Sequence, residues 1–324
     1  MKKVAAVVLL LSAVLISLAF AQDVRRIPMI VKVSGIQWFD RMEEGVREYA
    51  ADTGIDAFQL GPSQADAALQ VQIIEDTIAQ GVDAIAVVPF SPEALEPVLR
   101  RAREQGIVVV THEAPSQQNV DYDVEAFRNR EYGAYLMDQL AECMEEEGEY
   151  AVFVGSLTSE THNDWVDGAV ERQQESYPNM TQVGSKNETY DDVSAAADAA
   201  REVLRAFPNI KGFQGSASTD VAGIGQVIEE RGLEDRTCVM GTSLPSIGGQ
   251  YIETGAVDAV FFWDPALAAY VALDVANMVL DGETVETGMD LGKEGYENVT
   301  VEGKVIYGQA WVTVTLENLA NYDF

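Results

Sequence analysis

The side chains that most often do chemistry are few in this sequence and form no familiar catalytic pattern. His112 and His162 are the only histidines among the 324 residues, which argues against a histidine-rich metal site. The sequence has no HExxH zinc motif, no CxxC pair and no Walker phosphate loop. A pair of carboxylates that hydrolyses glycosides stays open as an alternative, because acidic residues are so numerous, but no pair stands out.

Two short motifs resemble known active-site patterns, but each lacks a glycine that the pattern requires. Ser246 follows Leu244-Pro245, so a leucine stands where a G-x-S-x-G nucleophile elbow has its first glycine. Gly223-Ile224-Gly225 lacks the third glycine of a dinucleotide fingerprint and falls inside a helical pattern instead of opening a helix. We therefore expect no enzyme activity, no cofactor and no metal site.

Polar and aromatic residues gather instead where the predicted strands end. In open α/β sheets, ligands bind beside the carboxyl ends of the strands. Three of the four tryptophans and both histidines fall at such positions. The candidate ligand contacts are Lys32, Trp38, Phe39, Phe90, Glu113, Thr161, His162, Asn163, Trp165, Ser216, Asp220, Ser243, Trp263 and Asp264.

This set is typical of a site for a small polar ligand such as a sugar. Aromatic rings cover the apolar C–H face of a sugar, while carboxylates and amides form hydrogen bonds with its hydroxyl groups. Each residue alone has a plainer explanation, since Asp220 and Ser246, for example, are good helix N-caps. The prediction of a sugar site therefore rests on the aromatic and polar residues taken together.

Lys32 stands among the apolar residues of the first predicted strand, where an unpaired charge is costly. Three placements are open for it. Its ammonium group can face a ligand oxygen, it can neutralise Glu113 or Asp220 across a cleft, or it can point outward from the strand.

The elements that must position these residues alternate along the chain. Four apolar strands at 27–33, 55–60, 84–88 and 107–111 are separated by helices at 38–52, 66–80 and 92–105. After a polar stretch at 113–123, the pattern resumes with helices at 130–147, 163–176, 191–206, 220–231, 246–254 and 265–280 and strands at 150–155, 181–185, 210–215, 237–241 and 259–263. This indicates an α/β protein with two doubly wound parallel-sheet lobes. A TIM barrel has a similar number of βα units, but the polar break favours two open sheets.

The N-terminus predicts export. Lys2 and Lys3 precede an apolar run at 4–20, and Ala19-Phe20-Ala21 fits a signal-peptidase site, so residues 1–21 are expected to be a signal peptide. The alternative is a membrane anchor, but the run is short and lacks a basic flank on its far side. We expect a periplasmic protein that is not embedded in the membrane.

Composition narrows the partners. A formal net charge of −32 excludes nucleic acid as a plausible partner and suggests adaptation to saline surroundings. Cys143 and Cys238 are far apart and few for a disulfide scaffold, so both are expected to be small buried core residues rather than a bridge.

Several short segments, in this order, carry a family resemblance. They are Lys32-Val33-Ser34-Gly35 before Trp38-Phe39, Gly81-Val82-Asp83-Ala84-Ile85 before Ser91-Pro92, Asn163-Asp164-Trp165, Phe262-Trp263-Asp264-Pro265 and the terminal Asn321-Tyr322-Asp323-Phe324. On them, the chain resembles periplasmic sugar-binding proteins of the ribose-binding type (type I). It is most similar to the branch of rhamnose-binding and autoinducer-2-binding proteins of ABC transporters.

The resemblance implies two lobes joined by a three-strand hinge, which close over the ligand and deliver it to a membrane permease, a chemoreceptor or a sensor kinase. It implies an N-terminal lobe of 22–122 plus about 264–285 and a C-terminal lobe of 123–263 plus about 286–324, in a monomer. It also places the family's ligand contacts at Trp38 and Phe39, Glu113, Thr161 to Asn163, and Asp220, with the hinge at Trp263-Asp264.

Departures from the branch bear on the ligand. Autoinducer-2 binders carry Asp-Gln where this chain has Thr161-His162, and a proline near Ser216. The sequence therefore favours a monosaccharide, such as a rhamnose-like deoxysugar, a pentose or a hexose. An autoinducer-2-type binder and a secreted carbohydrate-active enzyme are the alternatives. A sugar-responsive repressor is disfavoured because it would need an N-terminal helix-turn-helix and a surface that tolerates DNA.

Overall fold

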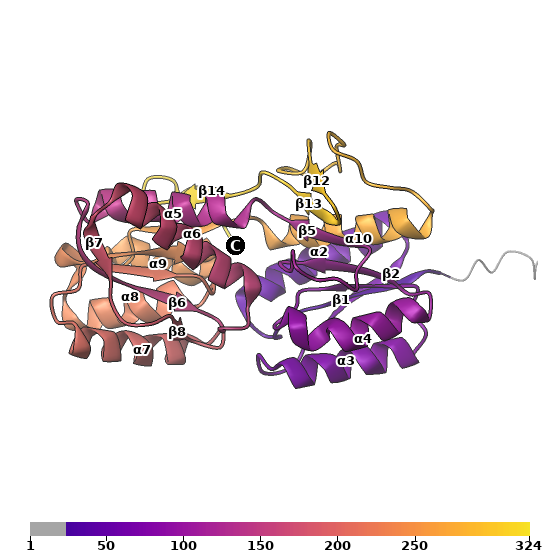
Figure 1. The fold of residues 1–324 in the computed structure, drawn as a ribbon, viewed down its shortest axis with the longest axis horizontal. Coiled ribbons are helices and arrows are strands. Elements are labelled where there is room, and N and C mark those ends of the chain that lie inside the picture. The colour runs from indigo at the N-terminus through magenta and orange to yellow at the C-terminus, as the bar shows by residue number, and fades with distance from the viewer. Residues whose placement is uncertain (1–23) are drawn as a thin grey trace, which may run out of the picture.

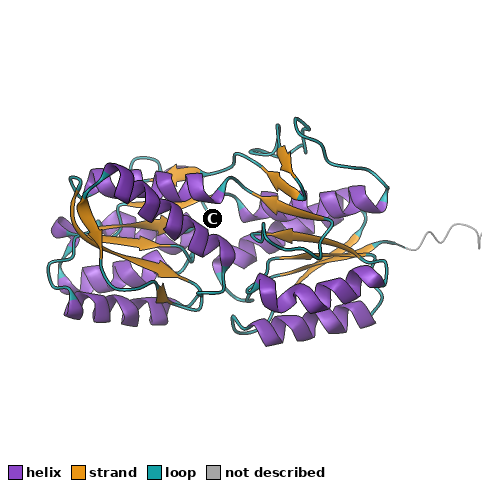
Figure 2. Ribbon diagram, viewed as in Figure 1, coloured by secondary structure: helices purple, strands orange, loops and turns teal. Residues whose placement is uncertain are grey.

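A computed structural model describes residues 24–324, which form two lobes side by side, each a mostly parallel sheet between layers of helices (Figures 1 and 2). The predicted fold class is confirmed. The predicted signal peptide, residues 1–21, lies outside the described residues. Among the residues described, no helix is long and apolar enough to cross a membrane.

The first lobe is built on a seven-stranded sheet of order β12-β13-β5-β4-β3-β1-β2. Its strands are β1 (Arg26–Ile30), β2 (Asp56–Leu60), β3 (Ala84–Val87), β4 (Val108–His112), β5 (Tyr122–Glu125), β12 (Thr300–Glu302) and β13 (Val305–Tyr307). Helices α2 (Gln37–Thr53) and α10 (Pro265–Leu280) pack together on one face, and α3 (Ala67–Ala79) and α4 (Pro92–Glu104) on the other (Figure 1).

The second lobe repeats this plan around a sheet of order β14-β11-β10-β9-β6-β7, with β8 also paired to β6. Its strands are β6 (Glu147–Val154), β7 (Asn179–Gln182), β8 (Asn187–Glu188), β9 (Gly212–Gly215), β10 (Cys238–Thr242), β11 (Ala259–Phe262) and β14 (Val312–Val314). Its helices are α5 (Asn129–Cys143), α6 (Glu160–Ser176), α7 (Val193–Ala206), α8 (Asp220–Arg231) and α9 (Pro245–Thr254), with 3₁₀ turns at Glu234–Arg236 and Leu319–Asn321.

The central strands form because they are apolar on both sides and covered on both sides. Every residue of β3 and of β11 is buried, as expected for parallel strands between helical layers. Helix ends follow the predicted signals. The Asp66 and Asp192 side chains cap α3 and α7, and Gly54 ends α2 in the left-handed conformation.

Three crossovers join the lobes, at 126–128, 263–264 and 308–311. The strand pairing differs from the division expected from the sequence, which put 123–263 and about 286–324 in the second lobe. β5 and β13 pair in parallel within the first sheet, and β12 extends it as an antiparallel edge. The sequence pattern does not predict β5, because the polar residues Asp123 and Glu125 interrupt the apolar run that marks the other strands.

The two cysteines form a disulfide, so the prediction of two unbridged core cysteines is wrong. Cys143 ends α5 and Cys238 begins β10, with their Cα atoms 6.0 Å apart despite a separation of 95 residues in the sequence. Distance along the chain was a poor guide because the fold brings the end of this helix against the start of a central strand. A cross-link that closes a loop of this length typically stabilises a domain by about 2–5 kcal/mol.

Candidate ligand-binding site

A cavity of about 20 Å³ lies between the lobes, where the carboxyl ends of strands from both sheets face each other. This volume is close to that of a single water probe. The residues that line it come from both lobes: Lys32, Ile36, Trp38, Phe39 and Glu113 from the first, His162, Trp165, Asp191, Ser216, Ser218 and Thr242 from the second, and Trp263 from the second crossover.

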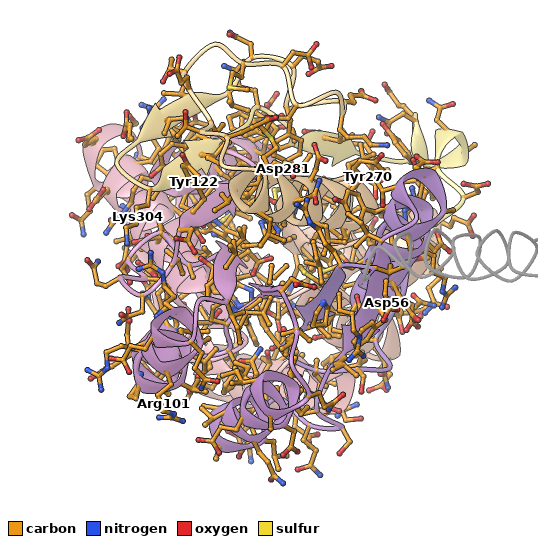
Figure 3. The ribbon with its side chains drawn as sticks, turned by 90° about the vertical axis from the view of Figure 1, so that its right-hand side faces the viewer. Asp56, Arg101, Tyr122, Tyr270, Asp281 and Lys304 are labelled. Atoms are coloured by element: carbon orange, nitrogen blue, oxygen red, sulfur yellow. A yellow bond between two sulfur atoms is a disulfide. The ribbon has the colours of Figure 1, made fainter. Side chains whose placement is uncertain are left out.

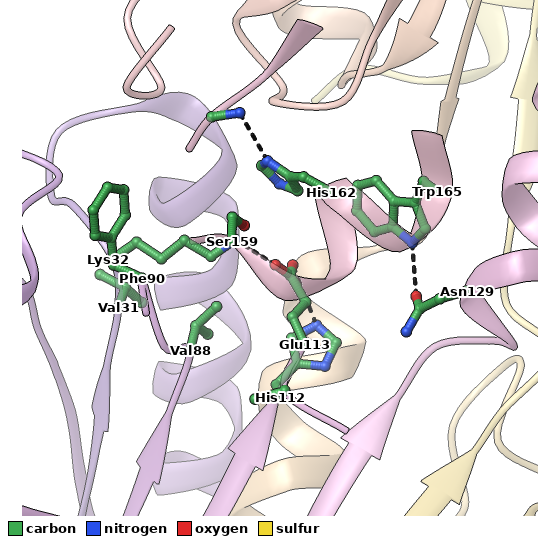
Figure 4. Close-up of polar contacts among 12 residues, drawn as sticks. Val31, Lys32, Val88, Phe90, His112, Glu113, Asn129, Ser159, His162 and Trp165 are labelled. Atoms are coloured by element: carbon green, nitrogen blue, oxygen red, sulfur yellow. Dashed lines mark hydrogen bonds and ion pairs between the residues drawn. The ribbon is translucent and has the colours of Figure 1, made fainter. Parts of the chain in front are cut away.

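A buried ion pair stands on the first-lobe side. The Lys32 Nζ atom donates to Glu113 Oε2 at 2.5 Å, and both side chains are less than 5% exposed (Figure 4). Burial opposes the charged ammonium, but the carboxylates of Glu113 and Asp191 outweigh it, so the pKa of Lys32 is raised. Of the three placements open to Lys32, the structure has the pairing with Glu113.

Both histidines are neutral, and their hydrogen bonds fix the tautomers. The backbone N–H of Gly155 donates to His162 Nδ1 at 3.0 Å, so the proton is on Nε2. Burial, reinforced by the charge of Lys32, lowers the pKa of His162 well below its usual value. His112 donates from Nδ1 to the Val124 carbonyl at 2.6 Å and accepts from Trp263 Nε1 at 3.2 Å; burial lowers its pKa too.

Asp191 was not among the predicted site residues, although its side chain lines the cavity from the second lobe. It follows β8, adopts φ 54°, and is 8% exposed. Burial raises the pKa of Asp191, which Lys32 partly offsets. The sequence pattern predicts one helix over 191–206 and does not indicate β8, the two-residue strand before it. A better signal would have been the turn-forming run Tyr190-Asp191-Asp192 after a polar strand.

Four aromatic side chains line the cavity, and contacts between rings join its three tryptophans. The rings of Trp38 and Trp263 pack edge to face with their centroids 4.8 Å apart, and the centroids of Trp165 and Trp263 are 5.7 Å apart. Trp165 also donates from Nε1 to Asn129 Oδ1 at 2.6 Å (Figure 4). These rings are thus fixed parts of the cavity wall, joined by Phe39 from α2.

Asp220 and Ser243 shape the second-lobe wall from behind it. Asp220 is fully buried; its Oδ2 accepts from the backbone N–H groups of Ser216 and Ala217 at 3.0 and 2.9 Å, and its Oδ1 accepts from Thr189. Burial raises the pKa of Asp220 to about 7. Ser243 donates to the Ser218 carbonyl at 2.6 Å, so both residues hold the loop that carries Ser216 and Ser218.

The remaining predicted contacts are not among the residues that line the cavity. Asn163 donates to the Ser156 and Ser159 carbonyls and so fixes the start of α6. Asp264 caps α10 and forms an ion pair with Arg41 at 2.6 Å. Two others complete this group: Phe90, whose backbone N–H is bonded to Gln70, and the buried Thr161. The structure therefore gathers Lys32, Trp38, Phe39, Glu113, His162, Trp165, Ser216 and Trp263 at one cavity.

Comparisons with known proteins agree with this architecture. A family model described as periplasmic binding protein domain matches residues 27–284. The D-allose-binding periplasmic protein of Escherichia coli is 28% identical over 246 residues, 71% of this chain and 76% of that protein. A D-ribose/D-allose-binding protein of Pseudomonas aeruginosa is 23% identical over 283 residues, 82% of this chain and 85% of that protein.

Solved structures show the same fold. An ABC transporter solute-binding protein from Clostridium phytofermentas with bound L-rhamnose superposes with a TM-score of 0.85 at 23% identity, covering 92% of this chain and 98% of that one. LsrB from Clostridium saccharobutylicum in complex with AI-2 has a TM-score of 0.85 at 21% identity, with coverage of 92% and 100%.

Proposed function

The chain belongs to the periplasmic binding protein family, and on that premise we propose that it is the solute-binding protein of an ABC importer. It captures a monosaccharide between its two lobes and delivers the sugar to a membrane permease. The proposal extends to a periplasmic location, with residues 1–21 as the signal peptide, and to action as a monomer.

The composition of the cavity wall carries the proposal. Hydrogen-bond donors and acceptors lie there together with aromatic rings, which suits a ring compound with hydroxyl groups on its edge and C–H groups on its faces. Lys32 and the Nε2–H of His162 can donate, while Glu113 and Asp191 can accept.

Capture requires the lobes to move. A cavity of about 20 Å³ is too small for a monosaccharide, so the sugar enters a more open form and is enclosed afterwards. The three crossovers at 126–128, 263–264 and 308–311 provide the hinge. The Ser116 hydroxyl of the first lobe donates to the Glu160 carboxylate of the second at 2.7 Å. Opening of the lobes would break this exposed contact.

The named ligands of the relatives support a monosaccharide over other small polar ligands. Two curated relatives are named for D-allose and for D-ribose with D-allose. Thr161-His162, in place of the Asp-Gln pair of autoinducer-2 binders, argues against that signal molecule. We therefore propose a deoxysugar such as rhamnose, a pentose or a hexose.

A thermal-shift screen of the mature protein tests the proposal. A ligand that binds only the folded state raises the melting temperature, by several degrees at a hundredfold excess over its Kd. Pentoses, hexoses, deoxysugars, sugar alcohols and autoinducer-2 are the probes, and one monosaccharide is expected to give the largest shift. Tryptophan fluorescence should change with the same sugar, because Trp38, Trp165 and Trp263 line the cavity. A shift with autoinducer-2 alone, or turnover of a glycoside, would contradict the proposal.

A further inference from the structure

The charged groups that line the cavity do not balance. Within the described part of the chain, the lining holds one cation, Lys32, and two carboxylates, Glu113 and Asp191. His162 adds no charge, because its Nδ1 accepts a hydrogen bond and burial keeps the ring neutral. Lys32 is engaged by Glu113 at 2.5 Å, so the carboxylate of Asp191 is in excess.

The side chain of Asp191 is 8% exposed, and across residues 24–324 it accepts no hydrogen bond and forms no ion pair within 4 Å. A carboxylate this deeply placed that accepts no hydrogen bond from the protein keeps its acceptor capacity for a ligand in the cavity. Its backbone is in the left-handed region at φ 54°, which asparagine and aspartate tolerate better than other non-glycine residues.

A glycine at the cavity makes room for this side chain. A Cβ atom on Gly155 would lie 2.8 Å from Asp191 Oδ2 and 3.0 Å from His162 Nδ1, so these two side chains occupy the space above a glycine at the end of β6. The glycine leaves room for the carboxylate to face Lys32 and Glu113 across the cavity.

We infer that Asp191 fixes the charge class of the ligand. Its carboxylate accepts a hydrogen bond from a hydroxyl or ammonium group of a neutral or amine-bearing sugar, and it excludes sugars that carry a carboxylate or a phosphate. The exclusion is electrostatic: an anionic ligand would bring a third negative group beside Asp191 and Glu113, and Lys32 is the one cation that residues 24–324 contribute to the lining. This inference rests on the proposed function and assigns a specificity role within it.

The unliganded protein provides the first test. Asp191→Asn keeps the shape of the side chain and its tolerance of the left-handed backbone but removes the unpaired charge. We expect its melting temperature to rise above that of the wild type at pH 8, by a few degrees. Asp76→Asn, the same change on the exposed face of α3, is the control and should leave the melting temperature unchanged. An Asp191→Asn variant no more stable than the wild type would overturn the inference.

The second test measures binding by calorimetry with sugars matched in shape and different in charge. The probes are D-galactose, D-galactosamine and D-galacturonate, D-glucose, D-glucosamine and D-glucuronate, and D-ribose with D-ribose 5-phosphate. In the wild type, each anionic member should bind at least tenfold more weakly than its neutral counterpart. In Asp191→Asn that ratio should shrink severalfold. An anionic member that binds as tightly as its neutral counterpart, or an unchanged ratio in the variant, would overturn the inference while leaving the proposed function intact. Failure of every probe, in every charge form, would count against both.

Discussion

Glu113 and Asp191 share an uncommon backbone conformation on opposite sides of the cavity. Their φ angles are 64° and 54°, in a region that costs a non-glycine residue of order 1 kcal/mol or more. Each follows a strand that ends at the cleft, and each carboxylate acts on the charge of Lys32. Residues in this backbone region cluster at ligand sites in proteins generally, which fits the place of both residues at the cavity.

Asp220 makes stability depend on pH. Its pKa is raised to about 7 by burial, against roughly 3.9 in an unfolded chain. Between those values the folded state holds a proton that the unfolded state has released, so the free energy of unfolding falls as pH rises toward 7 and then levels off. Asp220→Asn has no charge to bury and should gain stability relative to the wild type, by at most about 4 kcal/mol at pH 8 and by little at pH 4.

Urea unfolding of the Asp220→Asn variant and the wild type from pH 4 to pH 8 measures this difference. The amide oxygen can still accept from the Ser216 and Ala217 N–H groups, so the loop at the cavity is retained. Asp76→Asn controls for removal of one charge from an acidic protein. A stability difference between Asp220→Asn and the wild type that does not vary with pH would show that Asp220 is ionised throughout this range.

The sequence predicts which residues lie near the cavity better than it predicts what each side chain does there. A residue's place after a strand follows from the pattern, so Lys32, Trp38 and His162 were correctly expected near the strand ends. Whether the side chain faces the cavity or the loop behind it depends on local turns. Asp220 therefore supports the wall instead of forming it, and Asp191 was overlooked.

Helices α5 and α6 cross so closely that glycine is required on both. A Cβ atom on Gly133 would lie 2.0 Å from the Trp165 carbonyl oxygen, and one on Gly168 would lie 2.5 Å from the Arg130 carbonyl oxygen. Gly133→Ala should therefore force the helices apart and cost about 1–3 kcal/mol or more. Because Trp165 lines the cavity, the variant should also bind its sugar more weakly.

Chemical denaturation and calorimetry test the Gly133→Ala variant. Glu142→Ala, at an exposed position of the same helix, is the matched control and should change neither stability nor affinity. Equal stability of the two variants would mean that α5 and α6 can separate without cost.

Strands that are apolar throughout were predictable, and strands with polar residues or distant pairing partners were not. Strands such as β3 and β11 are apolar throughout and lie between helices, so their pattern identifies them. β8 has two residues, whereas β12 pairs with β13 and β13 pairs with the distant β5 at one edge of the first sheet. Such pairing is decided by tertiary contacts, which a local pattern does not contain.

At the scale of the whole molecule, the three crossovers meet in one aromatic cluster. Phe127 of the first crossover contacts Trp263 of the second and Trp311 of the third, with ring centroids 5.2 and 5.5 Å apart. Trp263 also lines the cavity and packs against Trp38 of the first lobe. A ligand that contacts Trp263 therefore touches the hinge directly, which gives a physical route from binding to closure.

The surface of the molecule is strongly acidic, and this should make stability depend on salt. The sequence has 53 Asp and Glu against 21 Lys and Arg. Charged side chains project outward around the first lobe, with Arg101 at its edge (Figure 3). Exposed ion pairs such as Arg101–Glu75 lose strength in salt, but each contributes at most about 1 kcal/mol. Repulsion among the many unpaired carboxylates is the larger effect, and salt screens it.

We therefore expect the melting temperature to rise steeply as sodium chloride increases from about 0.05 M to 1 M, where the screening length falls from more than 10 Å to about 3 Å. Most of the gain should appear at the low end of this range, since Coulomb screening saturates, whereas a gain from stronger hydrophobic burial would keep growing with concentration. Sucrose at matched osmolality controls for exclusion effects that do not involve charge. A melting temperature that is flat in salt would mean that the acidic residues are spaced widely enough for water alone to screen them.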